Sequence, residues 1–235
     1  MSKVKNMIKK ILAALFPRIR YGVMAYSSEG EDLILRRIFG RKHKGVYVDV
    51  GAHHPFRFSN TYLFYKKNWR GINIDPQPGM QALFNKYRPH DTNLEMGVSG
   101  IPQELTYAIF NEPALNTFSA ERVQEYTQKP DYQVIDRKTV KTAPLADILD
   151  RYLPAGTSID FISIDVEGMD LEVLRSNNWD KYRPSYVLVE SQPYDIEKED
   201  SEVLSFMREM GYSIFAKTCY TYFFKNNRLN GTEWL

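Results

Sequence analysis

Acidic side chains close four apolar segments of this chain. They are Asp49, Asp75, the pair Asp165 and Glu167, and Glu190. The segments before them are short and rich in valine and isoleucine, which is typical of buried strands. In an open α/β sheet, ligands bind beyond the carboxyl ends of the strands. We therefore expect these carboxyl groups to share one polar site.

The first two strand ends have the spacing of an adenosine site. Asp49 and Gly51 close the first strand, and Asp75 closes the next one about two dozen residues later. In that layout Gly51 permits close approach of the ligand, and Asp75 can bind both ribose hydroxyls. The sequence has neither G-x-G-x-x-G nor G-x-x-x-x-G-K-[ST], so no glycine cradle for a pyrophosphate or triphosphate is predicted. An adenosine cofactor without phosphates points to S-adenosylmethionine (SAM).

The neighbours of these acids are expected to complete the cofactor site. Asp49 can receive the amino group of the cofactor directly or through water, and Ala52 lies in the same turn. Pro76 can lie against the adenine. Ser28 and Glu31 begin the preceding helix and can reach the methionine end, although helix capping explains these polar residues nearly as well.

The acids at the later strand ends are expected to face the reacting group. Asp165, Glu167 and Glu190 can bind hydroxyls, hold a divalent cation such as Mg²⁺ or accept a proton, and the metal alternative rests on Asp165 and Glu190. His53 and His54 follow the first strand, and an imidazole can act as a general base near neutral pH. We expect only one of the two rings to face the site, with the other bonded to backbone.

The composition is that of a globular protein of one domain with an extension. The chain has 235 residues, of which 43% are hydrophobic. Its single cysteine, Cys219, excludes an internal disulfide and a cysteine-based zinc site, and a reducing cytoplasm is the simplest compartment. Beyond residue 20 the chain carries 25 basic and 29 acidic groups, which argues against a nucleic-acid partner.

The N-terminal segment 1–24 is predicted to be a basic amphipathic helix. Its first 20 residues hold six basic groups and no acid. Apolar residues recur there at helical spacing: Val4, Met7, Ile8, Ile11, Leu12 and Leu15. The apolar run is too short to cross a bilayer, which takes roughly 20 residues. The helix is expected to lie on an anionic membrane surface, at the inner face, or to dock on the body or on a second copy.

Hydrophobic periodicity and turn residues divide the rest of the chain into alternating elements. Helices are expected at 31–39, 60–67, 78–87, 120–128, 144–152, 169–177 and 201–210. Strands are expected at 46–51, 71–75, 93–98, 105–110, 133–142, 159–165, 185–190, 212–217 and 220–225. This alternation predicts an α/β fold with a mainly parallel sheet. The strands at 105–110 and 133–142 are expected to form an added hairpin, and the closing pair an antiparallel edge strand.

Four segments resemble the FkbM family of SAM-dependent methyltransferases. They are SSEGEDLIL at 27–35, YVDVGAHHP at 47–55, GINIDPQP at 71–78 and ISIDVEGMDLEVL at 162–174. The resemblance covers about residues 25–225 and implies a class I methyltransferase fold, which is a Rossmann-like seven-stranded, mainly parallel sheet with its last strand antiparallel. The domain is expected to span 25–235. Many relatives carry Asn and a second Gly where this chain has His53-His54-Pro55, which implies a cofactor loop of different shape.

The resemblance also implies methylation of a hydroxyl oxygen, commonly on a sugar or a polyketide-like product. We expect a saccharide acceptor, either a glycan or a nucleotide- or lipid-linked sugar of polysaccharide assembly. One alternative is a secondary-metabolite acceptor, since the sequence does not encode the acceptor legibly. Another alternative is a non-catalytic nucleotide-binding module. The absence of the glycine motif of dinucleotide-binding proteins argues against it.

Overall fold

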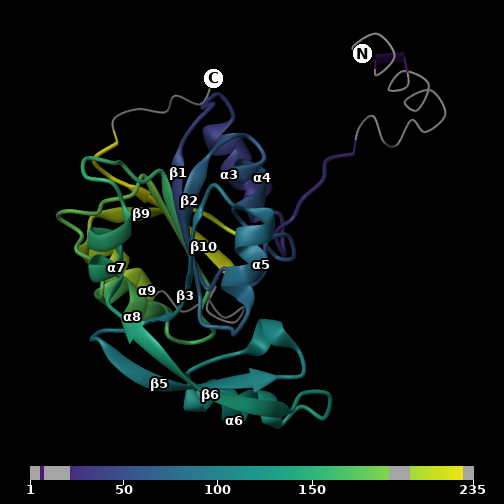
Figure 1. The fold of residues 1–235 in the computed structure, drawn as a ribbon. Coiled ribbons are helices and arrows are strands. Elements are labelled where there is room, and N and C mark those ends of the chain that lie inside the picture. Colours follow the sequence, from purple (N-terminus) through teal and green to yellow (C-terminus); the bar gives the residue numbers. More distant parts are fainter. Residues whose placement is uncertain (1–5, 8–21, 191–201, 230–235) are drawn as a thin grey trace.

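The computed structural model describes residues 6–7, 22–190 and 202–229. The helix predicted over residues 1–24 falls almost wholly outside these ranges. The described residues form a seven-stranded sheet in the order β3-β2-β1-β7-β8-β10-β9 (Figure 1). Its strands are β1 Val46–Val50, β2 Arg70–Asp75, β3 Thr92–Glu95, β7 Phe161–Ile164, β8 Tyr186–Glu190, β9 Tyr212–Lys217 and β10 Thr221–Asn226.

The strand directions confirm the predicted sheet. Strands β3, β2, β1, β7 and β8 pair in parallel, and β10 is antiparallel to both of its neighbours. The last strand, β10, is the antiparallel one, as expected, but its expected place at the edge is wrong, because β10 lies between β8 and β9 and β9 forms the edge. Burial accounts for this order. The apolar β10 is buried along most of its length, whereas β9 exposes Ser213, Ile214 and Phe215.

Helices cover both faces of the sheet (Figure 1). On one face lie α7 Leu145–Tyr152, α8 Asp170–Arg175 and α9 Glu202–Glu209. On the other lie α3 Glu31–Phe39 and α4 Tyr62–Tyr65, and α5 Met80–Tyr87 packs beside β3. Successive side chains of a strand point to opposite faces. In β1, Val48 and Val50 therefore join the core under α7 and α8, while Tyr47 joins the core under α3 and α4.

A second, three-stranded sheet lies between β3 and α7 in the sequence. It contains β4 Gly97–Val98, β5 Gln103–Phe110 and β6 Val134–Ala143, in the order β4-β6-β5. The predicted hairpin is confirmed, since β5 and β6 pair antiparallel. The single strand expected at 93–98 is wrong: the chain changes sheets at Met96, because β3 pairs with β2 and β4 pairs with β6.

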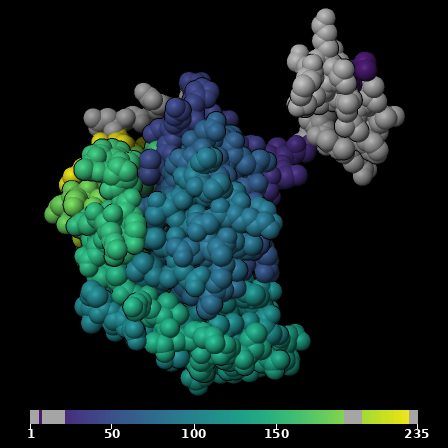
Figure 2. Space-filling model, viewed as in Figure 1, coloured from purple at the N-terminus to yellow at the C-terminus, as the bar shows by residue number. Residues whose placement is uncertain are grey.

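We call residues 103–143 the insertion. Besides β5 and β6 it contains a short 3-10 helix, η1 Pro113–Leu115, and α6 Ala120–Thr127. Figure 2 shows it as the teal and green layer along the lower end of the molecule. None of the helices in the described ranges has the length and apolar composition that a bilayer crossing requires.

Candidate active site

A cavity opens between the carboxyl edge of the seven-stranded sheet and the insertion. Its walls come from the turns after β1, β2 and β7, the end of β8 and the inner side of the insertion. Nine of the residues predicted from the sequence line it: Ser28, Glu31, Gly51, His53, Asp75, Pro76, Asp165, Glu167 and Glu190. Asp49, Ala52 and His54 are not among the residues that line it. The fold thus brings most of the predicted site together.

Asp75 organises the turn that begins this cavity wall. Its carboxylate accepts the backbone N–H of His53 at 2.7 Å and that of Gln77 at 2.8 Å. Burial raises the pKa of Asp75 to about 6, and these two N–H groups oppose the rise. The Asp75 carboxylate therefore ties the turn after β1 to the turn after β2. Lone pairs remain on both oxygens for a ligand in the cavity.

The packing of strand ends in the sheet requires a glycine at position 51. Its φ is +80°, and a Cβ at this position would lie 1.7 Å from the carbonyl oxygen of Asp165. No side chain fits there, because the end of β1 runs against the backbone that follows β7. The close approach expected at Gly51 is thus made by the protein's own chain, although Gly51 also lines the cavity.

Asp49 points to the face of the sheet that carries α4, as the alternation along β1 requires. It is 5% exposed, and its carboxylate accepts the Thr61 hydroxyl at 2.6 Å. Thr61 in turn accepts a guanidinium N–H of Arg88 at 2.9 Å. Burial raises the pKa of Asp49, while Thr61 and Arg88 lower it. This network lies behind the cavity wall, so the cofactor contact predicted for Asp49 stays a prediction.

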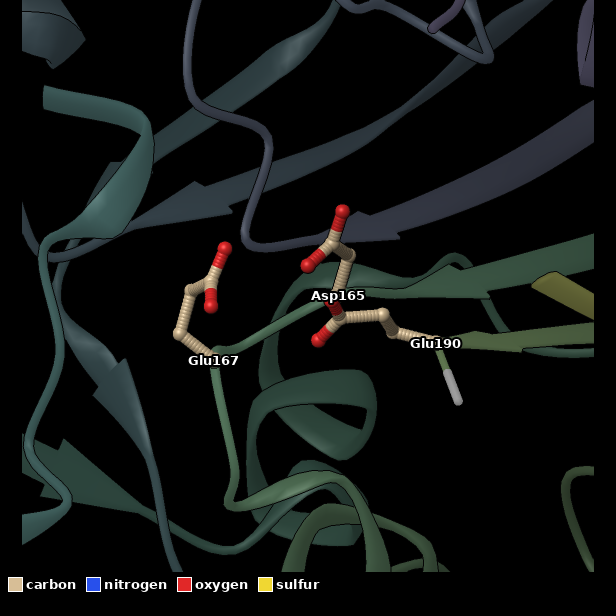
Figure 3. A group of neighbouring side chains, drawn as sticks. All are labelled: Asp165, Glu167 and Glu190. Carbon is tan, nitrogen blue, oxygen red and sulfur yellow. The ribbon is translucent and has the colours of Figure 1, made fainter. Parts of the chain in front are cut away.

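The carboxyl groups of Asp165, Glu167 and Glu190 gather around one space (Figure 3). One oxygen from each lies within 4.8 Å of the others. Burial raises the pKa of all three, and repulsion among these acids and Asp170 raises it further. Asp165 faces the open cavity, so solvent there screens part of this repulsion. A divalent cation, a hydroxyl hydrogen or a shared proton would each relieve it.

Glu167 is held by the insertion. The Tyr126 hydroxyl, on α6, donates to its Oε2, and the Thr117 hydroxyl donates to its backbone carbonyl at 2.8 Å. Its φ is +52°, a left-handed conformation that glutamate rarely adopts. Burial raises the pKa of Glu167 to about 7, although the bond from Tyr126 and the charge of Arg122 lower it. A carboxyl group near that value can exchange a proton at neutral pH.

The two histidines have different surroundings. His54 Nδ1 accepts the backbone N–H groups of Phe56 and Arg57, both at 3.1 Å, so this ring is used in its own turn. His53 lines the cavity, and its Nε2 is buried without a hydrogen-bond partner in the described structure. Burial lowers the pKa of His53 to about 4, helped by the nearby Arg57 and His54. His53 is therefore neutral at pH 7.

Several residues that the sequence did not single out also line the cavity. Phe58 and Asn60 come from the loop before α4, and Tyr107, Asn116 and Phe118 come from the insertion. Asn60 donates to the Ser163 hydroxyl at 2.9 Å, while its own Oδ1 is buried without a partner in the described structure. These residues belong to no strand-end motif, and their place depends on how the insertion folds back over the sheet. No local signal could have found them.

Three methyltransferases are among the solved structures to which this chain is similar. Precorrin-6y C5,15-methyltransferase from Geobacter metallireducens is 12% identical, with a TM-score of 0.43 and coverage of 83% of this chain and 85% of that one. TrmK from M. capricolum, bound to S-adenosyl-homocysteine, is 11% identical, with a TM-score of 0.44 and coverage of 89% and 74%. An O-methyltransferase from Bacillus cereus is 9% identical, with a TM-score of 0.38 and coverage of 95% and 89%. Similarity this distant assigns neither cofactor nor acceptor.

No curated protein matches the chain significantly. The sequence profile of the methyltransferase FkbM domain matches residues 49–214, which is more than half of the chain. That range begins at Asp49 in β1, contains the whole insertion and ends in β9. It includes the turn after β1, Asp75 and all three acids of Figure 3. The chain belongs to the methyltransferase FkbM domain family.

Proposed function

We propose that this methyltransferase transfers the methyl group of SAM to a hydroxyl oxygen of a saccharide. The observation that carries the proposal is the cavity itself, which has Asp75 and Pro76 in one wall and the carboxyl groups of Asp165, Glu167 and Glu190 in another. The first pair suits an adenosine, and the three acids suit an acceptor rich in hydroxyl groups. The compartment is proposed to be the cytoplasm.

The residues present fit SAM. Asp75 keeps lone pairs for the ribose hydroxyls, and Pro76 offers an apolar surface for the adenine. Ser28 and Glu31 line the cavity near the start of α3, where they would hold the amino-acid end. Two buried polar atoms of the lining, His53 Nε2 and Asn60 Oδ1, have no partner in the described structure. Buried polar atoms nearly always have a partner, so both point to a bound polar molecule.

SAM, when bound, supplies an electrophilic methyl group on a positively charged sulfur. The acids of the cavity orient the acceptor by accepting hydrogen bonds from its hydroxyls. The sulfur–methyl bond would break as the acceptor oxygen takes the methyl group, S-adenosyl-homocysteine would leave, and a carboxylate oxygen of Glu167 would take the hydroxyl proton. The Tyr126 hydroxyl occupies Glu167 Oε2 and thereby fixes which way the carboxylate points. Positioning of this kind accounts for much of the rate in such displacements.

Glu167 suits the role of proton acceptor better than His53. A general base works best when its pKa lies near the working pH. Burial raises the pKa of Glu167 to about 7, whereas it lowers that of His53 to about 4. The neutral imidazole of His53 is better suited to bond with the cofactor or acceptor. A divalent cation held by Asp165 and Glu190 stays a prediction, and retention of full activity in the presence of a chelator would remove it.

Replacing Asp75 with Asn tests the cofactor site. Asp75→Ala would leave two backbone N–H groups without acceptors, so Asn is the better variant because it retains one carbonyl oxygen. We expect the affinity for S-adenosyl-homocysteine to fall by roughly 1.5–3 kcal/mol in calorimetry, the range for hydrogen bonds to a charged group. Glu95→Gln is the matched control, since Glu95 also accepts two backbone N–H groups at a strand end but does not line the cavity.

Unchanged affinity in Asp75→Asn would remove Asp75 from the cofactor site. The acceptor is tested separately, by incubating the protein and SAM with a panel of mono- and oligosaccharides and nucleotide sugars. We expect a gain of one methyl mass on a saccharide hydroxyl. Methylation confined to non-carbohydrate acceptors in a parallel panel would refute the saccharide assignment.

A further inference from the structure

Phe58 is an exposed apolar side chain in the wall of the cavity. The residue is 46% exposed although it lines the cavity together with Asp165 and Glu167. Its φ is +55°, in the left-handed region that bulky side chains avoid. Such a conformation persists only where the surrounding structure imposes it, and such residues cluster at binding sites. Among the described residues nothing covers this aromatic ring fully, which suits a ring that contacts a ligand.

Side chains from two parts of the molecule hold the ring. The His53 ring stacks on Phe58, with centroids 6.0 Å apart and planes inclined by 21°. The guanidinium carbon of Arg57 lies 4.4 Å from the centroid of the Phe58 ring. Arg57 also forms an ion pair with Glu112 of the insertion, at 2.8 Å. Phe58 is thus clamped where the loop before α4 meets the insertion.

The charged side chains that line the cavity have one sign. Six carboxyl groups line the cavity in the described part of the chain: Glu29, Glu31, Asp75, Asp165, Glu167 and Glu190. The same lining contains no lysine or arginine, and its one imidazole, that of His53, is neutral at pH 7. Arg57, which lies beside Phe58, is paired with Glu112. An anionic group of an acceptor would lose its hydration here and face these carboxyl groups, with no lysine or arginine of the described lining to pair with.

We propose that Phe58 binds the acceptor through the apolar C–H surface of an uncharged, polyhydroxylated ring, and that phosphate and carboxylate groups of an acceptor stay outside the cavity. This inference rests on the proposed function and narrows it. Hydroxyls of such a ring can donate to the carboxyl groups, whether these are ionised or protonated. A C–H surface packs against an aromatic ring, which supplies contact area at low entropy cost. An acceptor of this class uses both features of the cavity.

The left-handed backbone at Phe58 allows a variant that removes the ring without straining the backbone. Glycine adopts that conformation without strain. Phe58→Gly should therefore keep the melting temperature of the wild type, or raise it, while it removes the ring. Phe58→Trp keeps an aromatic surface at the same place. Tyr87→Leu is the matched control, because Tyr87 is 42% exposed and contacts Phe56 but does not line the cavity.

The test uses saturation-transfer NMR on the full chain loaded with S-adenosyl-homocysteine. The neutral probes are methyl glucoside, methyl galactoside and methyl mannoside, and the anionic probes are glucuronate, galacturonate and glucose 6-phosphate. We expect transfer to at least one neutral probe and at least fivefold less to every anionic one. Phe58→Gly should lose at least four fifths of the neutral signal, whereas Phe58→Trp and Tyr87→Leu should keep it.

Three results would overturn the inference: an anionic probe that receives as much saturation as the neutral ones, no transfer to any neutral probe, or a full neutral signal in Phe58→Gly. A fall in melting temperature in Phe58→Gly would show that the ring is part of the core instead. Calorimetry with S-adenosyl-homocysteine separates this inference from the proposed function. If the cofactor product fails to bind the wild type, the proposed function fails; if it binds and the probes behave otherwise, only the inference about Phe58 fails.

Discussion

At Glu167 the backbone and the side chain are both constrained by neighbours from the insertion. Thr117 bonds to its carbonyl, Tyr126 bonds to its carboxylate, and its φ is +52°. The residue lies three positions after the end of β7, so the sheet sets its position and the insertion sets its orientation. A carboxyl group fixed in this way can be aimed at one acceptor hydroxyl.

Glu167→Gln is expected to lower methyl transfer by a factor of about 10²–10⁴, the usual contribution of a general base. Affinity for S-adenosyl-homocysteine should stay within about twofold. In the wild type, kcat/KM should rise with pH through about 7 and then level off, because the base acts when ionised and burial raises its pKa to about 7. Glu172→Gln is the control: Glu172 is a nearby α8 acid that bonds to the Gly100 N–H and does not line the cavity. Full turnover in Glu167→Gln would show that another group takes the proton.

The acids of the site were predictable because each ends an apolar strand, and parallel strands bring their carboxyl ends to one edge. The face to which the Asp49 side chain points could not be predicted. It depends on which helices cover each face of β1, and these helices come from distant parts of the chain. Phe58 could not be predicted, because no local sequence pattern indicates a phenylalanine with a left-handed backbone conformation. Residue types at strand ends thus predict where the site lies. The wall formed by the insertion and the loop before α4 is known only from the structure.

At the scale of elements, Gly51 joins β1 to β7. Gly51→Ala should destabilise the fold by roughly 2–4 kcal/mol, because a Cβ would overlap the Asp165 carbonyl at 1.7 Å and the strand ends would have to separate. Thermal unfolding monitored by circular dichroism measures this loss. Gly156→Ala is the control, because Gly156 has a similar φ of +77° but open space around its Cβ position. Its cost should be only that of left-handed alanine, about 1 kcal/mol. Equal losses in the two variants would mean that the β1–β7 contact yields easily.

Most helices and strands were predictable, because apolar periodicity and turn residues are local signals. The division of 93–98 between two sheets was not, since β4 takes its partner from β6, more than 40 residues later in the chain. The inner position of β10 also depends on a long-range choice between two hairpin strands. Nearby residues determine where helices and strands form. Which strands pair is decided by competition among segments that lie far apart in the chain.

For the whole molecule, the acids of the cavity link stability to pH. Burial raises the pKa of six carboxyl groups in or behind the cavity: Asp49, Asp75, Asp165, Glu167, Asp170 and Glu190. In the folded state these groups hold protons that the unfolded chain releases near pH 4. The contribution of Asp75, Asp170 and Glu167 is complete below that pH and is lost as pH rises through about 6–7, and the other three acids act in the same direction. His53 and His54 act in the opposite sense, because burial lowers the pKa of each, but they are fewer.

The free energy of unfolding of the cofactor-free protein should therefore be lower at pH 8 than at pH 5. Urea titrations at the two pH values measure the difference. SAM, as a cation, should stabilise the protein more at pH 8, where more carboxyl groups are ionised. A cofactor-free protein that is equally or more stable at pH 8 would show that the cavity acids are better solvated than their burial implies.

The N-terminal segment adds a separate prediction for the whole chain. Its six basic groups contribute about 1 kcal/mol each near an anionic surface. A chain that begins at Tyr21 should keep its fold and its affinity for S-adenosyl-homocysteine, but lose salt-sensitive binding to anionic liposomes. If the full chain ignores such liposomes, the segment does not serve membrane attachment. A change of oligomer size on truncation, measured by light scattering, would then identify an assembly role.

Strand pairing joins the insertion to the rest of the molecule over a short stretch, at Gly97–Thr142 and Val98–Ala143. Side chains of the insertion add bonds to residues outside it, from Glu112, Asn116, Thr117 and Tyr126. Tyr107, Asn116 and Phe118 reach the cavity from it, whereas Asp75 and Gly51 belong to the sheet. Mutation of a lining residue such as Phe118 can therefore alter the insertion's wall, whereas Thr117 and Tyr126 couple the insertion to Glu167. In evolutionary terms new acceptors can arise through changes in the insertion, provided that its bonds to Gln77 and Glu167 are kept. Exchange of this segment between relatives is the corresponding route for engineering.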